Sequence, residues 1–429
     1  MKKLLLLLPM LAVLLCGCNV PYVEPKPDDD PGNEKTEKHA IRSFELTDAE
    51  QQMNVQTNIF ALNMLKQIVS SEDLTQKPNI CFSPVSANMA LGILLGGADG
   101  QTRTEMQTVL GFGEATEEQV NAYYHKLVEA LPYLDSTTIV TIANALWLKE
   151  TFPVKDAYKR QTQATFNATI DNVRTFVDDA VIDMINQWAA DNTNNLIRKV
   201  IDRSMVSDDL MMVFANALYF KGIWDAKFEK SSTRQENFTT AAGKTEKKEM
   251  MTKFFSNARY ADTDVAQVLE LAYEGDKYCM DILLPKSGKQ PADVLDDLTP
   301  ERWAEIEKNV RWGSYDVDVW LPKFKYTYER SLIRDLQTLG IQAAFTPMAD
   351  FSKLSEVDTY LGFLKQVCYI AVDEQGTEAA AVTIGGNYTT SVGPEPQPKI
   401  FHATHPFVYI IRERQYGTIL FCGVVGNPS

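Results

Sequence analysis

Hydrophobic residues recur with two different periods along the chain. In the first half, residues 58–69, 85–98 and 181–192 carry apolar side chains three and four positions apart, which is typical of amphipathic helices. The later half is richer in short apolar or alternating runs that favour β-strands. These runs are residues 211–220, 278–285, 315–324, 407–411 and 417–425. The pattern predicts a mixed α/β (α+β) fold in which several strands are long enough for the centre of a large sheet.

The first 18 residues show neither period. A short basic start is followed by an apolar run that ends near Leu15, which indicates an export signal, and this run is shorter than the about 20 residues of a membrane span. Residues 15–18 also resemble the lipobox of bacterial lipoproteins, whose last cysteine is lipidated and becomes the mature N-terminus. We assign this role to Cys18, because Gly17 is small whereas Leu15 is not. A plain secretory signal is the alternative.

Composition then divides the chain into three parts. We expect a signal peptide at residues 1–17, a flexible acidic tether rich in Pro, Asp, Glu and Lys at residues 18–50, and one compact domain at residues 51–429. We expect the lipid to hold the protein in the bacterial cell envelope, at the outer membrane, with the domain periplasmic or surface-exposed.

Charge and cysteine usage exclude several function classes. The formal net charge of -15 opposes nucleic acid and anionic lipid headgroups, so we expect membrane contact through the lipid alone. The four cysteines beyond residue 18 stand singly in apolar surroundings, and the four histidines are not at metal-ligand spacing with them. We therefore expect buried cysteines, no metal and no cofactor.

Residues 374–386, with the sequence EQGTEAAAVTIGG, fit neither a helix nor an ordinary loop. If the segment forms a strand, five small residues share one face, because alternate residues of a strand point the same way. If a strand enters between two packed strands, bulky side chains on its inward face would clash with the filled layer beneath the sheet. Gly376 gives the backbone freedom at the entry. A short helix ending at the Gly-Gly pair is the alternative. The five residues are Thr377, Ala379, Ala381, Thr383 and Gly385.

The same segment resembles the hinge of the reactive-centre loop in inhibitory serpins. Sequence segments on both sides of it also resemble serpin segments, and they follow one another in the same order as in that family. Among them are residues 79–106, 214–228, 321–341 and 405–428. The resemblance covers the chain from about residue 51 to its end. It implies the serpin fold, with three β-sheets, eight to nine helices and a loop exposed between roughly Val382 and Ile400.

The resemblance implies an irreversible suicide-substrate inhibitor of proteases rather than an enzyme. In such serpins a protease cleaves the loop, forms an acyl-enzyme and is distorted as the freed hinge enters the central sheet. A non-inhibitory serpin acting as a binding or adhesion module is the alternative, although the small residues here remain compatible with insertion. The hinge residues are Glu374, Gly376, Thr377, Glu378, Ala379, Ala380, Ala381, Val382 and Thr383.

Further residues receive roles from the resemblance. Ser83, Ser86 and Asn186 are expected in a polar cluster beneath the sheet, called the shutter, and Trp224 at the breach where insertion begins. Gln366 stands where the family usually has a shutter histidine. Glutamine can donate and accept hydrogen bonds, but it does not titrate, so a pH response should be lost.

The scissile bond is expected about fifteen residues beyond Gly376, between Thr390 and Ser391. Residues 387–392 contain no Lys or Arg, which argues against a trypsin-like target. Elastase-like or subtilisin-like serine proteases, or papain-like cysteine proteases, suit the small side chains. Tyr388 leaves a chymotrypsin-like cut two residues earlier as the alternative.

Other partners and activities find little support. Residues 113–132 have few basic residues where heparin-activated serpins concentrate theirs, so we expect no heparin cofactor. We also expect a monomer. No GxSxG elbow accompanies His405, which argues against a hydrolase.

Overall fold

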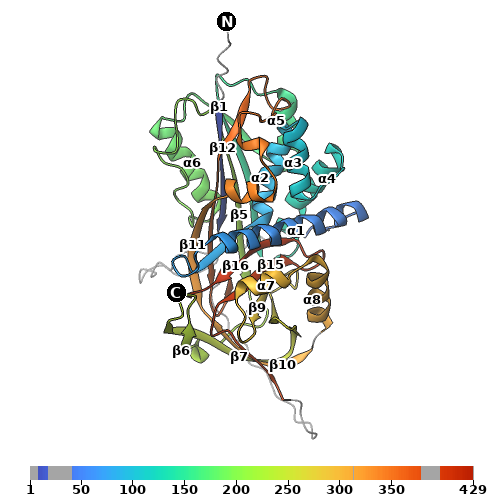
Figure 1. The fold of residues 1–429 in the computed structure, drawn as a ribbon, viewed down its shortest axis with the longest axis vertical. Coiled ribbons are helices and arrows are strands. Elements are labelled where there is room, and N and C mark those ends of the chain that lie inside the picture. Colours follow the sequence, from blue (N-terminus) through green and yellow to red (C-terminus); the bar gives the residue numbers. More distant parts are fainter. Residues whose placement is uncertain (1–7, 18–40, 313, 378–396, 429) are drawn as a thin grey trace.

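The computed structural model describes residues 8–17, 41–312, 314–377 and 397–428 (Figure 1). Within these ranges the predicted mixed α/β architecture is confirmed, with helices packed on two large sheets. The α-helices are α1 (Asp48–Ser71), α2 (Pro84–Gly97), α3 (Gly100–Leu110), α4 (Glu117–Ala130), α5 (Asp156–Phe166), α6 (Asp179–Asn192), α7 (Pro291–Asp297), α8 (Pro300–Trp312) and α9 (Ile333–Leu339).

The central sheet has the strand order β11-β12-β1-β5-β3-β4, and the short β13 also pairs with β5. Helix α2 packs on one face and α6 on the opposite face, as Figure 1 shows. The sheet is thus covered on both sides, which agrees with the apolar sequence of its middle strands. Its strands are β1 (Leu8–Gly17), β3 (Ile139–Lys149), β4 (Thr169–Val173), β5 (Met212–Ile223), β11 (Phe324–Ser331), β12 (Thr359–Val372) and β13 (Gly376–Thr377).

The remaining strands form one continuous path in the order β14-β10-β7-β8-β9-β15-β16-β2, with β6 paired to β7. The long β7 pairs with β6 and β10 near its start and with β8 near its end. Two of the three predicted sheets are therefore joined through β7. The strands are β2 (Asn79–Phe82), β6 (Arg234–Thr239), β7 (Thr245–Asp262), β8 (Ala266–Ala272), β9 (Tyr278–Pro285), β10 (Tyr315–Pro322), β14 (Lys399–His402), β15 (Phe407–Glu413) and β16 (Ile419–Val425).

Local sequence signals explain where the first two helices begin. The Thr47 side chain accepts a hydrogen bond from the Glu50 backbone N–H, and the Glu50 carboxylate accepts one from the Thr47 backbone N–H, which is a capping box. At the start of α2 the Ser83 side chain accepts a hydrogen bond from the Ser86 backbone N–H, and Pro84 occupies the first helical position, where a missing N–H costs nothing. Helix α2 is apolar and almost fully buried, so it forms the floor of the central sheet.

The N-terminal part differs from the expected division of the chain. Residues 8–17, expected within a signal peptide, form strand β1 in the middle of the central sheet. Phe44 and Leu46, expected in the tether, are buried, and α1 begins at Asp48. Packed structure therefore starts before residue 51, because apolar residues at positions 44 and 46 have a core to enter.

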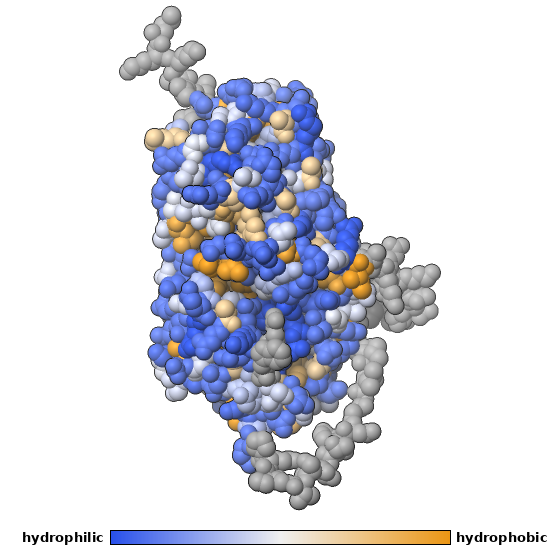
Figure 2. All heavy atoms as spheres, turned by 90° about the vertical axis from the view of Figure 1, so that its right-hand side faces the viewer, coloured by the Kyte–Doolittle hydropathy of each residue, from blue (hydrophilic) through white to orange (hydrophobic). Residues whose placement is uncertain are grey.

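The surface drawn in Figure 2 is mostly hydrophilic, and apolar side chains occur there in small separate groups. Scattered groups of this kind are ordinary on the surface of a folded domain. Among the described residues, no helix combines the length and the apolar character required to cross a bilayer.

Candidate functional site

The chain reverses direction directly after β12, in a segment that we call the hinge turn, residues 373–376. The backbone N–H of Asp373 donates to the Gly376 carbonyl (3.0 Å), and the Gly376 N–H donates to the Asp373 carbonyl (3.2 Å). Gly376 and Thr377 then pair antiparallel with Ile223 and Gly222 of β5. The turn thus directs the chain into the central sheet between β5 and β12, a position that we call the slot.

Gly376 is required at this position by space and by backbone conformation. Its φ is +142°, which L-residues with a side chain rarely adopt. A Cβ atom at residue 376 would lie 2.3 Å from the Gly222 carbonyl oxygen and 2.8 Å from the Ile223 Cα. The glycine therefore permits close backbone contact as well as freedom of movement.

Thr377 is fully buried and lies on the inner face of the sheet, as the alternation of small residues predicts. Its hydroxyl is 2.7 Å from the hydroxyl of Tyr273. The Tyr273 ring stacks on Trp224 with a centroid distance of 4.7 Å. The first inward residue of the hinge therefore lies in an enclosed position beside aromatic rings, with the Tyr273 hydroxyl as its polar partner.

Trp224 fixes the hinge turn through hydrogen bonds as well as packing. Its indole N–H donates to the Asp373 carbonyl (3.0 Å), and its backbone N–H donates to the Gln375 carbonyl (2.9 Å). The backbone N–H of Phe228 donates to the Glu374 carbonyl (3.0 Å). Trp224 consequently lies at the entrance of the slot. It is hydrogen-bonded to the hinge turn, the segment that would have to move if the loop entered the sheet.

A small charge network lies beside the same turn. The buried Glu374 carboxylate accepts a hydrogen bond from the Thr233 hydroxyl (2.7 Å) and is 3.4 Å from the Lys323 ammonium. Burial alone would raise the pKa of Glu374, but these partners hold it below its ordinary value. Burial also opposes the charge of Lys323, and Glu374 with Glu249 nevertheless raises the pKa of that ammonium. Both groups are thus kept ionised.

Beyond the hinge turn, the slot is occupied by β1. This strand runs parallel to both neighbours, with Leu14 opposite Asn216 of β5 and Gln366 of β12. Met10, Ala12 and Leu14 are buried against the core that contains α2. The expectation that bulky inward residues would be rejected is therefore wrong for this part of the slot, because the space above α2 holds Met and Leu.

A buried polar cluster lies beneath the slot at the start of α2. The Gln366 side chain accepts from the Ser83 backbone N–H (3.1 Å) and donates to the Ser83 carbonyl (2.9 Å). The Ser86 hydroxyl donates to Asn216 (2.5 Å), whose amide donates to Asn144 (2.8 Å). Glutamine thus fills the position with one donor and one acceptor, and each is paired in the presence of β1.

The expected role of Asn186 is wrong in this arrangement. Asn186 lies on α6, where its carboxamide oxygen accepts from the backbone N–H groups of Val200 and Ile201 and its amide donates to the Ile201 carbonyl. Asn216 occupies the shutter position instead. The signal that could have found it is a single polar residue in the centre of the otherwise apolar run 211–220.

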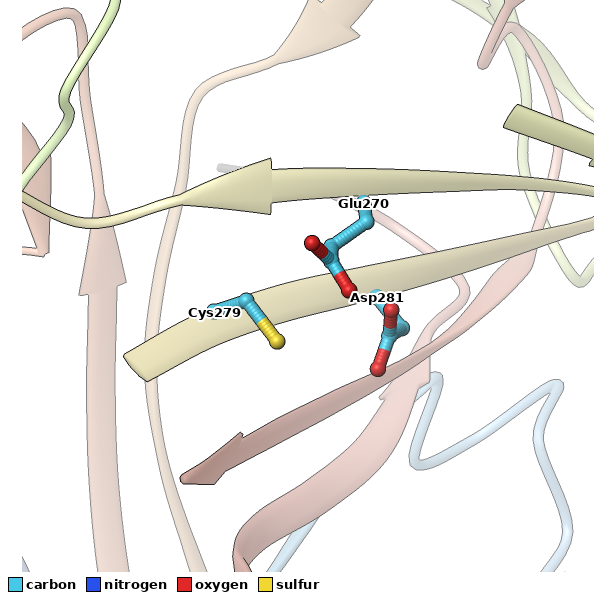
Figure 3. Close-up of side chains that lie close together, drawn as sticks. All are labelled: Glu270, Cys279 and Asp281. Atoms are coloured by element: carbon cyan, nitrogen blue, oxygen red, sulfur yellow. The ribbon is translucent and has the colours of Figure 1, made fainter. Parts of the chain in front are cut away.

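Three other side chains meet at a distance suitable for a metal ion: Glu270, Cys279 and Asp281 (Figure 3). Arg412 already binds both carboxylates, with its Nη2 2.8 Å from Glu270 and its Nε 2.6 Å from Asp281. Arg259 and Arg414 also approach Glu270. Burial raises the pKa of the Cys279 thiol well above its usual range. The group is explained as a buried ion-pair network.

Several predicted positions lie outside the described residues. They are Cys18, the later hinge residues Glu378, Ala379, Ala380, Ala381, Val382 and Thr383, and the reactive-bond pair Thr390 and Ser391. At the other end of the expected loop, Lys399 and Ile400 belong to β14, which pairs with β10. A strand therefore begins at Lys399, just before the expected end of the loop near Ile400. The cysteines Cys81, Cys279, Cys368 and Cys422 are buried and unbridged.

Comparisons with known proteins give one consistent result. The family model described as serpin (serine protease inhibitor) matches residues 55–428. Iripin-2 of Ixodes ricinus is 31% identical over 379 residues, which cover 86% of this chain and 92% of that protein. An uncharacterized serpin-like protein of Thermococcus kodakarensis is 30% identical over 441 aligned positions and covers 100% of both chains.

The solved structures agree. The crystal structure of tengpin, a thermophilic serpin, in its native state has a TM-score of 0.76 and 27% sequence identity, and the match covers 91% of this chain and 97% of tengpin. Together with the family match over most of the chain, this fold identifies the relationship. The chain belongs to the serpin family.

Proposed function

We propose that this serpin is an irreversible suicide-substrate inhibitor of serine proteases. The observation that carries the proposal is the pairing of Gly376 and Thr377 with β5 at the entrance of the slot. A hinge that has already turned into the sheet, with its first inward side chain buried, would continue the same ladder once its chain is freed and the slot is open.

The described residues also support the capacity of the sheet to take an added strand. β1 lies between β5 and β12 while the polar cluster around Ser83 stays hydrogen-bonded. Opening the sheet therefore leaves Ser83 and Gln366 paired, and avoids the cost of unpaired buried polar groups. This is a requirement for an inhibitor whose sheet must part.

The chemical step follows from the family mechanism. The protease serine attacks the carbonyl carbon of Thr390, the peptide bond to Ser391 breaks, and Ser391 leaves as a new amino terminus that takes up a proton. An ester then joins Thr390 to the protease. Insertion of the freed segment would carry this ester away from the entrance and distort the protease before water can hydrolyse it.

The target class follows from the side chains beside the bond. Residues 387–392 are Asn, Tyr, Thr, Thr, Ser and Val, without a cation. An elastase-like or subtilisin-like pocket accepts small side chains of this kind, whereas a trypsin-like pocket contains a buried acid that would lack its partner. Papain-like cysteine proteases remain a second group of targets.

Incubation with subtilisin-like, elastase-like and trypsin-like proteases tests the proposal. We expect an SDS-stable band of higher mass with the first two only, and mass spectrometry should find a released C-terminal peptide that begins at Ser391. Cleaved protein should melt at a higher temperature than intact protein. Cleavage without either a covalent band or a rise in melting temperature would instead favour a non-inhibitory binding module.

We further propose that a lipid on Cys18 anchors the protein to the bacterial cell envelope. The support is the sequence before Cys18 and the acidic segment after it, which would hold the domain away from the membrane. Replacing Cys18 with Ala should release soluble protein from the membrane fraction. Unchanged membrane association of Cys18→Ala would refute the lipid anchor.

A further inference from the structure

The slot between β5 and β12 has an occupant with a complete set of backbone partners. Each of the ten residues of β1 has a pairing partner in β12, from Thr359 to Tyr369, and eight residues also have partners in β5, from Met212 to Tyr219. An added strand with both edges paired leaves few backbone groups without a hydrogen bond.

The side chains of this occupant also fit both faces of the sheet. Met10, Ala12 and Leu14 are at most 1% exposed and pack into the main core, whereas Val13 is fully buried in the separate cluster beneath α6. A strand alternates its side chains between the two faces, so an apolar segment is needed where both faces are covered. The site therefore selects an extended apolar peptide.

The same β5 edge is the one that the hinge has begun to use. Gly376 pairs with Ile223 and Thr377 with Gly222, so each further residue of an antiparallel strand would move one residue back along β5. In that register Ala380 would face Tyr219, which pairs with Gly17, and Asn387 would face Met212, which pairs with Met10. Residues 380–387 and residues 10–17 thus require the same eight positions.

We propose that the slot is a binding site for residues 8–17 of the chain itself, and that this segment blocks insertion of the reactive-centre loop for as long as it remains attached. The second half of this inference rests on the proposed inhibitory function, whereas the first half does not. Two strands cannot both pair with one β5 edge, so occupancy by one excludes the other.

The two occupants differ at the polar cluster. Leu14 lies between Asn216 and Gln366, and in the antiparallel register Thr383 would take that place. Leucine offers these side chains no hydrogen bond, whereas threonine offers a hydroxyl. The loop is therefore chemically matched to the polar cluster. The N-terminal segment is held in the slot by apolar contacts and backbone pairing instead.

Removal of residues 1–17 would empty the site. Processing in front of Cys18 would then do more than release a membrane anchor, because it would also convert a blocked inhibitor into an insertion-competent one. The N-terminal segment would act as a temporary plug that keeps the sheet from accepting its own loop before export is finished.

The test uses the full chain with Cys18→Ala, so that the N-terminal segment stays attached, and confirms the intact mass. Into this background, Leu14→Asp places a charge where the core admits none, and we expect it to expel β1. Val20→Asp adds the same charge three residues beyond the strand and serves as the matched control. Hydrogen–deuterium exchange should show residues 8–17 protected in the control and rapidly exchanging in Leu14→Asp.

Inhibition then tests the blocking. If the site is open for one tenth of the time, the control should trap a subtilisin-like protease roughly tenfold more slowly than Leu14→Asp, since the rate scales with the open fraction. A chain that begins at residue 18, provided that it melts cooperatively, should match Leu14→Asp. A synthetic peptide of residues 8–17 should slow both of these forms.

The outcomes separate the two proposals. Rapid exchange of residues 8–17 in the control would overturn the binding site. Protected exchange with equal trapping rates in control and Leu14→Asp would overturn the blocking role. Protected exchange in the control, without trapping by any form, would leave the binding site standing and overturn the inhibitory function.

Discussion

The slot between β5 and β12 is entered from its two ends by different segments. At the hinge end, Gly376 and Thr377 enter antiparallel to β5, held by hydrogen bonds from Trp224 and Phe228. At the other end, β1 enters parallel to both neighbours and is held by buried apolar side chains. The hinge end therefore selects particular residues, whereas the part that β1 occupies accepts an apolar strand in the opposite direction. Specificity for the loop is concentrated at the entrance.

The largest effect is expected from a charge at the entrance. Thr377→Arg would force a cation into a site where Thr377 is fully buried beside Tyr273, and a buried unpaired charge is very costly. We expect complete loss of covalent complexes, while the loop is still cleaved. Gel analysis with a subtilisin-like protease measures the ratio of cleaved to trapped protein.

Two controls sharpen this result. Thr377→Ser keeps the hydroxyl and should keep trapping. Glu378→Arg places the same cation on the next residue, which points to the opposite face of a strand, and should trap as well. Equal trapping by Thr377→Arg and Glu378→Arg would show that the entrance does not select by side chain.

An intermediate effect is expected beneath the slot. Gln366→Ala would leave the Ser83 backbone N–H without the acceptor that it has now, at a cost of about 1–3 kcal/mol in the free energy of unfolding. Urea denaturation at pH 8 measures this cost. An unchanged midpoint would mean that another acceptor, or water, replaces the glutamine.

Gln366→His provides the pH arm of the same experiment. A buried imidazole is disfavoured when charged, so its folded pKa lies below the unfolded value of about 6.5, and stability should fall as the pH drops below that value. The wild-type cluster has no titrating group at residue 366 and should lack this contribution between pH 8 and pH 5. A similar slope in both proteins would contradict the assignment.

The smallest effect concerns the anchoring charge of the hinge turn. The pKa of Glu374 lies below 4.5 in the folded protein, so its contribution is present above pH 4.5 and is lost as the pH falls through the folded value. We expect Glu374→Gln to cost about 1 kcal/mol or less at pH 7, and the cost should decrease as the pH falls below 4.5. The exposed Glu356→Gln is the control. Faster hydrogen exchange at residues 372–377 would show that the hinge turn has loosened. An unchanged exchange rate at pH 7 would show that Glu374 does not stabilise the turn.

The sequence predicted much of the entrance, because the relevant constraints are local. A glycine followed by alternating small residues specifies an entering strand, and Thr377 does lie on the inner face. Trp224 was placed at the entrance by the resemblance, but its hydrogen bonds to residues 373 and 375 depend on the turn and could not be read from the sequence.

The part of the slot that β1 occupies was much less predictable. Residues 8–17 form a short apolar segment, which is why the sequence predicts an export signal there. The same two properties, short length and apolar character, also suit a strand that is covered on both faces of a sheet. Only the presence of an open position in the sheet decides between these outcomes. The assignment of Asn186 failed for a similar reason, since two asparagines lie in apolar surroundings and only packing shows that Asn216 reaches Ser86.

The buried arginine limits how the rest of the molecule can respond to an incoming strand. Arg412 on β15 ties Asp281 on β9 to Glu270 on β8, and all three side chains are almost fully enclosed. If β15 slipped by two residues along β9, Arg412 would move away from Asp281. Both charges would then be buried without partners, which is strongly unfavourable. The nine-stranded sheet is thus resistant to shear, and it behaves as a fixed frame. Any deformation that insertion causes would be directed into the central sheet, because among the described residues no buried ion pair of this kind joins β5 to β12.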